Sequence, residues 1–153
     1  AAEVLDFAES IAKPGVTTDY IDQKVHKMII EHGAYPSPLN YGGFPKSVCT
    51  SLNECICPGI PDDTVLMDGD IVNIDVTVFL DGHHGDTSRT VLVGNVSDEV
   101  RALCKATDVR IAFPKSRHLR LPPLHDCLSA ILPVTTVTTT YITSALFAHT
   151  IHP

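Results

Sequence analysis

The chain has 153 residues, of which 44% are hydrophobic and 19% are charged, an ordinary composition for a globular protein. Its length suits one domain, and no stretch reaches the roughly 18 consecutive apolar residues of a transmembrane helix, which argues against a membrane protein. The formal net charge of −7 argues against nucleic acid as a partner.

Two helices are predicted within the first 33 residues. Apolar residues at helical spacing predict the first over residues 1–12, and Lys13-Pro14-Gly15 ends it. Thr17 or Thr18 can cap the second, and Gly33 is a suitable stop. The apolar stripe of the second helix consists of Ile21, Val25, Met28 and Ile29. Because the sequence opens inside a helix and lacks an initiator Met, we expect a fragment, with any targeting segment upstream.

Loops and turns follow the second helix. Prolines and glycines punctuate residues 34–46, which we expect to form a loop. Residues 47–52 predict a short strand. Residues 53–63 and 68–70 are rich in turn-forming residues and separate this strand from the next.

The clearest predicted element is a β-hairpin over residues 71–93. Its first strand is rich in β-branched residues, and Asp81-Gly82 is a strong signal for a two-residue turn. One face of the first strand is apolar and consists of Val72, Ile74, Val76, Val78 and Leu80. The other face carries Asn73, Asp75 and Thr77. After the hairpin, Ser97 can cap a short helix that begins near Asp98.

The hairpin brings two carboxylates together. A two-residue turn places Asp75 opposite Ser88 and Asp86 opposite Thr77, so that the two aspartates are diagonal neighbours on one face. Such neighbours lie about 7–8 Å apart at the backbone. Two carboxylates at that separation can hold two cations about 3.5–4 Å apart. The alternatives are a solvated strand face without metal, and a three-residue loop that puts the pair on opposite faces.

Two histidines follow the turn, and only one of them can face the carboxylates. Adjacent strand residues point to opposite faces, so His84 shares the face of Asp86 and His83 does not. We interpret His84 as a hydrogen-bonding neighbour rather than a ligand. Because residues 1–104 offer few other donors near this face, a complete metal site requires ligands from later in the chain.

The chain changes character after Lys105. Residues 1–104 carry 6 Lys or Arg and 16 Asp or Glu, whereas residues 105–153 carry 5 and 2 and contain neither Gly nor Glu. We therefore predict a first domain at 1–104 and a tail at 105–153 that is out of frame or intron-derived; the alternative is an unusual but genuine extension.

The chain has five cysteines, an odd number, and no two of them form a CxxC pair. This favours a reducing compartment over disulfides or a closed zinc site.

Four runs of sequence resemble the signature of type I methionine aminopeptidases. They are YGGFPKSVCTSLNE at 41–54, GIPDD at 59–63, DGDIVNIDVTV at 68–78 and HGDTSRT at 84–90. The resemblance is continuous over about residues 1–104. It implies the α/β pita-bread fold, in which two related halves surround a central antiparallel sheet. Here the fold would be incomplete and joined to an unrelated C-terminal tail.

The resemblance also implies a chemistry. The family removes the initiator methionine from nascent chains whose second residue is small, using two divalent ions (Co, Mn, Fe or Zn) that activate a bridging water. Asp75 matches the aspartate that chelates one metal, and Asp86 matches the one that bridges both. Tyr41, Phe44 and Cys49 match positions that line the methionine side-chain pocket, and aromatic rings with sulfur suit a thioether. Taken alone, each of these three would be read as core packing.

Departures from the family pattern bear on activity. The family has a His just before Gly-Ile-Pro, where this chain has Pro58, which offers no side-chain donor. The family also supplies a His and two Glu as further metal ligands from its second half, but no Glu follows Glu99 here. At most two of five metal-binding side chains are therefore present. We expect a weak metal site and impaired or no turnover from this chain.

The sequence leaves two other functions open. A non-catalytic binding protein with the pita-bread fold is the alternative, although the intact Asp75 and Asp86 speak against an old loss of ligands. Another pita-bread hydrolase, such as a proline dipeptidase, fits residues 41–53 less well. The expected partners are nascent peptide N-termini, with the ribosome as a further candidate, and neither nucleic acid nor membrane. Residues 41–45 look like bacterial and organelle-directed members, which favours a mitochondrion or plastid over the cytoplasm.

Overall fold

The computed structural model describes residues 1–56 and 59–112, with side chains as far as Asp108. Ala1–Val96 form one compact unit, and Ser97 begins a second. The two predicted N-terminal helices are confirmed as α1 (Ala2–Ile11) and α2 (Thr18–Glu31). Within the described ranges, no helix is both long enough and apolar enough to cross a membrane.

Helix α2 begins at a side-chain cap. The Thr17 hydroxyl oxygen accepts a hydrogen bond from the Tyr20 N–H at 3.1 Å, which satisfies one of the free amides of the first turn. Thr18 does not cap the helix; its hydroxyl donates a hydrogen bond to the Asp62 carbonyl oxygen at 2.9 Å. At the other end, Gly33 adopts φ +71°, which fits the predicted stop.

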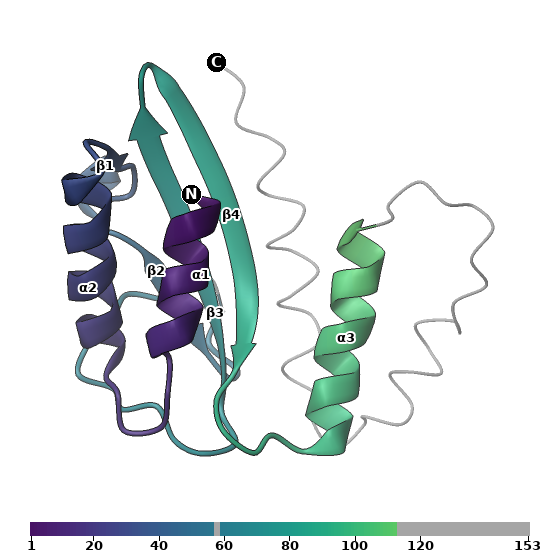
Figure 1. Cartoon of the computed structure of the whole chain (residues 1–153). Coiled ribbons are helices and arrows are strands. Elements are labelled where there is room, and N and C mark those ends of the chain that lie inside the picture. Colours follow the sequence, from purple (N-terminus) through teal and green to yellow (C-terminus); the bar gives the residue numbers. More distant parts are fainter. Residues whose placement is uncertain (57–58, 113–153) are drawn as a thin grey trace. The chain divides into compact units, whose positions relative to one another are not determined.

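Four antiparallel strands form the sheet of the first unit (Figure 1). They are β1 (Tyr35–Pro36), β2 (Cys49–Leu52), β3 (Ile71–Leu80) and β4 (His83–Leu92). Strand β3 is central: β4 pairs with one flank along its whole length, and β1 and β2 pair with successive parts of the other. Among the described residues, no strand pairs with the outer flank of β4. The strand predicted over residues 47–52 is β2, which begins two residues later than predicted, at Cys49. A short 3₁₀ turn, η1 (Tyr41–Gly43), lies in the loop before it.

The β3–β4 hairpin has the predicted two-residue turn. Asp81 and Gly82 have φ values of +50° and +84°, as a type I′ turn requires. The register that follows pairs Asp75 with Ser88 and Thr77 with Asp86, which confirms the predicted pairing.

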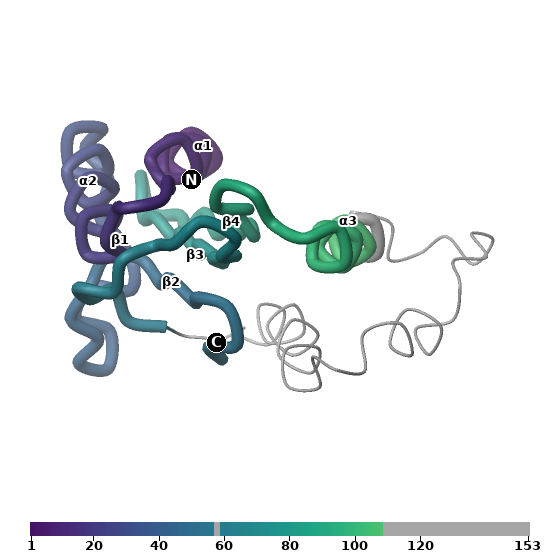
Figure 2. The backbone as a smooth tube through the Cα atoms, turned by 90° about the horizontal axis from the view of Figure 1, so that it is seen from below, coloured from purple at the N-terminus to yellow at the C-terminus, as the bar shows by residue number. Residues whose placement is uncertain are grey.

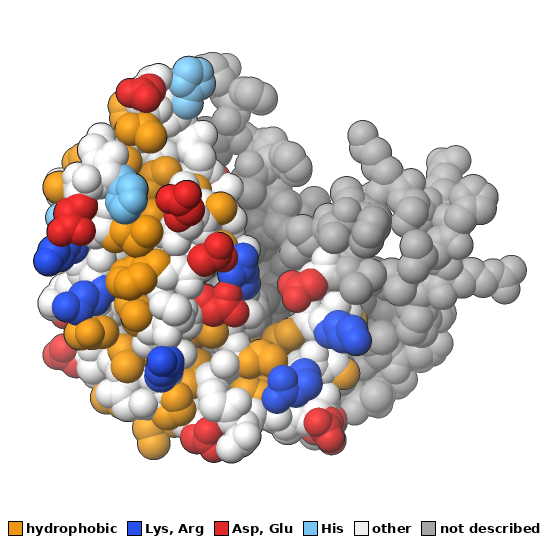
Figure 3. Space-filling view, in the orientation of Figure 1, with side chains coloured by type: hydrophobic (Ala, Val, Ile, Leu, Met, Phe, Trp, Pro, Cys, Tyr) orange, Lys and Arg blue, Asp and Glu red, His pale blue; other side chains and the backbone are white. Residues whose placement is uncertain are grey.

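The core lies between the sheet and the two helices, which cover the same face of it (Figures 1 and 2). Its most deeply buried apolar side chains come from both helices, from β3 and from two loops: Leu5, Ala8, Ile21, Val25, Ile29, Val48, Leu66, Val72, Ile74 and Val76. Each large side chain of this kind contributes about 1.5–3 kcal/mol on burial. Charged side chains surround a band of hydrophobic ones on the outer surface of this helical layer (Figure 3).

Leu80 falls on the apolar side of β3 by alternation but is 44% exposed, because it lies at the tip of the hairpin, which extends past the helices (Figure 1). One expectation about elements was wrong. The helix capped by Ser97 is α3 (Asp98–Ala112), which has 15 residues and is not short. No Gly or Pro interrupts these residues, so nothing ends the helix early. The division predicted after residue 104 stays a prediction, since residues 113–153 of the tail lie outside the described residues.

Candidate functional site

Asp75 and Asp86 lie on the face of the sheet opposite to α1 and α2. Strand β3 buries Val72, Ile74 and Val76 beneath the helices, so alternation directs its odd-numbered residues to the other face. Because Asp86 pairs with Thr77 on β4, it joins Asp75 on that face as a diagonal neighbour. The hairpin turn therefore determines that the two carboxylates meet.

The two aspartates interact directly. Burial raises the pKa of Asp75 to about 6, helped by repulsion from the charge of Asp86 and by a hydrogen bond that the protonated Asp75 shares with Asp86. Thr77 donates its hydroxyl hydrogen to the Asp86 carboxylate at 2.9 Å. Two like charges this close favour either a shared proton or a bound cation.

Polar side chains continue along the same face on both sides of the pair. Ser88 donates to the Asn73 amide oxygen at 3.1 Å, and the Asn73 amide donates to Thr90 at 3.4 Å. At the other end, the ring nitrogen Nδ1 of His84 lies 2.9 Å from the Ser37 hydroxyl, and its ring is 4.9 Å from that of Phe79. The interpretation of His84 as a hydrogen-bonding neighbour agrees with these contacts.

Cys49 is brought to the carboxylates from the other flank of β3. It pairs with Asp75, so Cys49, Asp75 and Ser88 form one row across three strands. The sequence assigned Cys49 to a pocket by resemblance alone. Its place beside Asp75 depends on the β2–β3 register, for which no local sequence signal exists.

The other predicted pocket residues lie in the loop before β2. Tyr41 is 76% exposed at the start of η1, and Phe44 is half-buried just after it. The loop is closed by hydrogen bonds from the Phe44 N–H to the Tyr41 carbonyl at 3.0 Å and from the Asn40 N–H to the Phe44 carbonyl at 2.8 Å. The roles of Tyr41, Phe44 and Cys49 in binding stay predictions. Pro58, at the position of the family's His, lies outside the described residues.

The donors present suit a hard divalent cation in kind but not in number. Asp75 and Asp86 supply carboxylate oxygens, which such ions prefer, and their mutual repulsion would be relieved by positive charge. Residues 1–56 and 59–108 contain no group of three or more His, Cys, Asp or Glu side chains that could hold a metal. The pair therefore fits as part of a metal site.

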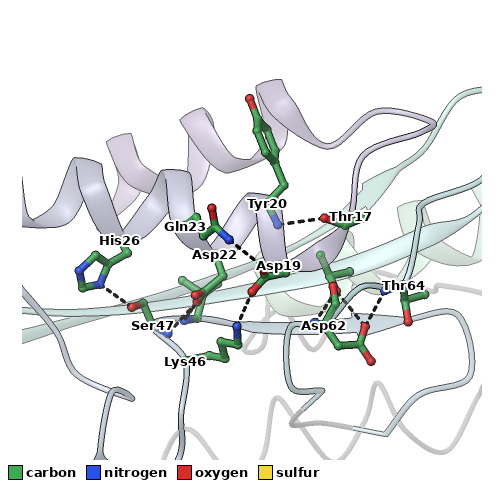
Figure 4. Close-up of polar contacts among 12 residues, drawn as sticks. Thr17, Asp19, Tyr20, Asp22, Gln23, His26, Lys46, Ser47, Asp62 and Thr64 are labelled. Atoms are coloured by element: carbon green, nitrogen blue, oxygen red, sulfur yellow. Dashed lines mark hydrogen bonds and ion pairs between the residues drawn. The ribbon is translucent and has the colours of Figure 1, made fainter.

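One carboxylate near the site was missed from the sequence. Asp22 of α2 is buried, with 6% of its surface exposed, and binds the backbone just before Cys49 (Figure 4). A signal was present, because Asp22 falls among the inward positions of the helix next to Ile21 and Val25. A carboxylate on an inward-facing stripe requires a buried partner.

Comparison with known proteins gives concordant matches to the described part of the chain. A model of metallopeptidase family M24 matches residues 1–109. Methionine aminopeptidase 1D, chloroplastic/mitochondrial, of Arabidopsis thaliana is 66% identical over 107 residues, which are 70% of this chain and 31% of that protein. Methionine aminopeptidase 1D, mitochondrial, of Homo sapiens is 61% identical over 98 residues, 64% of this chain and 29% of that protein.

A solved structure agrees with these sequence matches. The crystal structure of methionine aminopeptidase from Rickettsia prowazekii superposes with a TM-score of 0.72 at 52% identity, covering 73% of this chain and 45% of that one. This likeness confirms the predicted pita-bread fold for the matched part. The chain spans less than a third of the length of the two curated relatives.

Proposed function

The chain belongs to metallopeptidase family M24, and from this premise we propose that it carries the N-terminal half of a methionine aminopeptidase catalytic domain. The complete domain would remove the initiator methionine from nascent proteins in a metal-dependent reaction. The single observation that supports this most is the interaction between Asp75 and Asp86 on the sheet face opposite to α1 and α2. A bound cation would remove the repulsion between two carboxylates placed against each other.

Family membership implies use of a divalent metal, and Asp75 and Asp86 are the residues that we propose to hold it. When bound, the two ions of the family would supply an activated water for attack on the scissile carbonyl. Co, Mn, Fe and Zn all remain candidates. Because two carboxylates provide fewer donors than such ions require, we expect weak binding by this chain.

We propose that Cys49, Phe44 and Tyr41 contact the methionine side chain of the substrate. Cys49 lies in the same row of the sheet as Asp75, so a side chain packed on its sulfur would lie next to the carboxylates. A polarisable sulfur and aromatic rings suit the thioether of methionine. Tyr41 is largely exposed, so the part of the proposed pocket that Tyr41 would form is open to solvent in this chain.

The proposed partners are nascent peptide N-termini, with the ribosome as a further candidate. We also propose that the protein works in a mitochondrion or plastid. Support comes from relatives named as chloroplastic or mitochondrial in a plant and mitochondrial in human. The cytoplasm is the alternative, since the matched structure is bacterial.

The direct test is release of methionine from the tripeptide Met-Ala-Ser by the 153-residue chain with added cobalt or manganese. We expect no more release than from a double variant, Asp75→Asn with Asp86→Asn, because the described residues supply only two metal-binding side chains. Turnover that clearly exceeds this control would show that the argument from missing ligands is wrong. It would still support the two aspartates as the metal-binding residues.

A non-catalytic binding protein is the second candidate, favoured by the absence of a third metal-binding side chain around the pair in the described residues. Calorimetric titration of Met-Ala-Ser separates the two proposals. A binding protein should hold the peptide without added metal and should bind the double variant equally well. Binding that requires both metal and intact aspartates would favour the peptidase.

A further inference from the structure

The position of Cys49 depends on a strand that is weakly held by its own ladder. Strand β2 has four residues, and Cys49 is the first of them. Strand ends open more readily than strand interiors. The far end is fixed by Asn53, whose N–H donates to the Ile71 carbonyl at 2.9 Å and whose side-chain oxygen accepts from the Ile71 N–H at 3.0 Å. What holds the near end therefore decides whether Cys49 stays opposite Asp75.

The near end is held by a buried side chain of α2. One carboxylate oxygen of Asp22 accepts hydrogen bonds from the N–H groups of Ser47 at 2.7 Å and of Val48 at 3.2 Å (Figure 4). Ser47 and Val48 are 2% and 0% exposed, so water cannot replace these bonds. Both N–H groups reach the same oxygen in only one alignment of this segment with the helix. Hydrogen bonds to a buried carboxylate are among the stronger ones in proteins.

Two more residues on the same side of α2 support this alignment. Nδ1 of His26 lies 2.8 Å from the Ser47 hydroxyl, and Asp19 forms an ion pair with Lys46 (Figure 4). Asp19, Asp22 and His26 follow each other at intervals of three and four residues, which places them in one row along the helix. The row contacts Lys46, Ser47 and Val48, the three residues that lead into Cys49.

We propose that Asp22 is a positioning residue that keeps the side chain of Cys49 beside Asp75 by fixing the backbone of Ser47 and Val48. Its consequence for substrate rests on the proposed function, because Cys49 matters to catalysis only if it contacts the methionine side chain. The positioning itself is a property of the fold. It can therefore be tested in the whole 153-residue chain without turnover.

The experiment measures how fast iodoacetamide alkylates Cys49 and Cys55 in the native chain. Cleavage after Glu54 separates Cys49 from Cys55, and fragment-ion mass spectrometry distinguishes Cys55 from Cys57 on the second peptide. In Asp22→Ala we expect alkylation of Cys49 to be about tenfold faster, equivalent to about 1.4 kcal/mol of local stability. The rate at Cys55, which is exposed in the parent chain, should change less than about twofold. Asp22→Asn should give an intermediate rate at Cys49, because its side-chain oxygen still accepts one N–H.

Asp68→Ala is the control, because Asp68 accepts a hydrogen bond from the Asn95 N–H at 2.9 Å and lies in the loop before β3, outside the contacts that Asp22 makes with Ser47 and Val48. It should leave the Cys49 rate unchanged. The proposal is overturned if neither Asp22 variant accelerates Cys49, if Cys49 and Cys55 accelerate together, or if Asp68→Ala has the same effect. If Asp22→Ala does not fold, the rate in Asp22→Asn decides. Binding of Met-Ala-Ser without added metal, and equally by the Asp75→Asn/Asp86→Asn double variant, would count against the proposed function and would leave the thiol rates unaffected.

Discussion

At the scale of residues, the site is defined by two neighbouring carboxyl groups that repel each other when both are charged. The sequence predicts which face Asp75 and Asp86 occupy, because a two-residue turn and strict alternation are local properties of residues 71–92. It does not predict the raised pKa of Asp75. That shift depends first on burial, and burial is decided by what the rest of the chain places around the residue.

The raised pKa makes Asp75 a source of instability at neutral pH. A carboxyl group whose pKa rises from 3.8 to about 6 on folding contributes stability below pH 4, and this contribution is lost as the pH rises through about 6. Asp75→Asn should therefore raise the free energy of unfolding at pH 7.5 by about 3 kcal/mol, the free-energy equivalent of a pKa that moves from 3.8 to about 6. At pH 4 and below the variant and the parent should differ little. Urea unfolding at the two pH values measures both.

Asp81→Asn serves as the control for this prediction, because Asp81 is exposed in the turn and Asn tolerates its positive φ. It should leave the difference in stability between the two pH values unchanged. A loss of stability in Asp75→Asn at pH 7.5 would contradict the assigned repulsion. Saturating manganese should reverse the order, since only the parent chain can gain stability from a cation at both carboxylates.

At the scale of elements, β3–β4 and β2 differ in how far the sequence predicts them. The hairpin follows from its own turn and its own β-branched residues. The start of β2 depends instead on Asp22, which binds the N–H of Ser47, 25 residues later in the chain, and on Gly59, whose carbonyl accepts from the Thr50 N–H at 3.0 Å. Partners this distant in sequence leave no periodic pattern, so the sequence predicts a start two residues too early.

Substitutions at two glycines test whether β2 depends on distant backbone contacts and the hairpin on its own turn. A methyl group at Gly59 would lie 2.2 Å from the Thr50 carbonyl oxygen, so Gly59→Ala must displace the backbone that flanks β2. At Gly82 a methyl group meets nothing within 4 Å, and only the φ of +84° opposes it. We expect Gly82→Ala to cost about 1 kcal/mol of unfolding free energy and Gly59→Ala to cost about 3 kcal/mol. Urea denaturation of both variants measures this order, and equal costs would contradict the close approach of Gly59 to β2.

At the scale of the whole molecule, residues 1–109 match family M24, and the proposed function makes them part of a larger catalytic arrangement. The sequence predicts this from four continuous motifs, together with the need for ligands from elsewhere. Where β1 pairs with the end of β3, Tyr35, Phe79 and Leu80 are each at least 40% exposed. Residues 113–153 lie outside the described residues, so the predicted origin of the tail stays a prediction.

A chimera tests the whole arrangement. Residues 1–104 would be joined to the remaining catalytic segment of the Arabidopsis relative, which is 66% identical over the matched 107 residues. With added cobalt or manganese, this chimera should release methionine from Met-Ala-Ser, and Asp86→Asn should lower kcat/KM at least about 100-fold. Asp68→Asn serves as the control and should have little effect. If a folded chimera stays inactive even with Pro58→His, the proposed function of residues 1–104 is wrong.

The two carboxylates also differ in how firmly their backbones are held. Asp75 belongs to a strand bonded on both flanks, by β2 and by β4, whereas Asp86 belongs to β4, which the described residues bond on one flank alone. Peptide groups bonded to one neighbour open at a lower cost than those enclosed between two. The oxygen atoms of Asp75 would thus be held rigidly and those of Asp86 less so. When ions of different radius bind, the backbone of β4 rather than that of β3 would move to adjust the metal–oxygen distances.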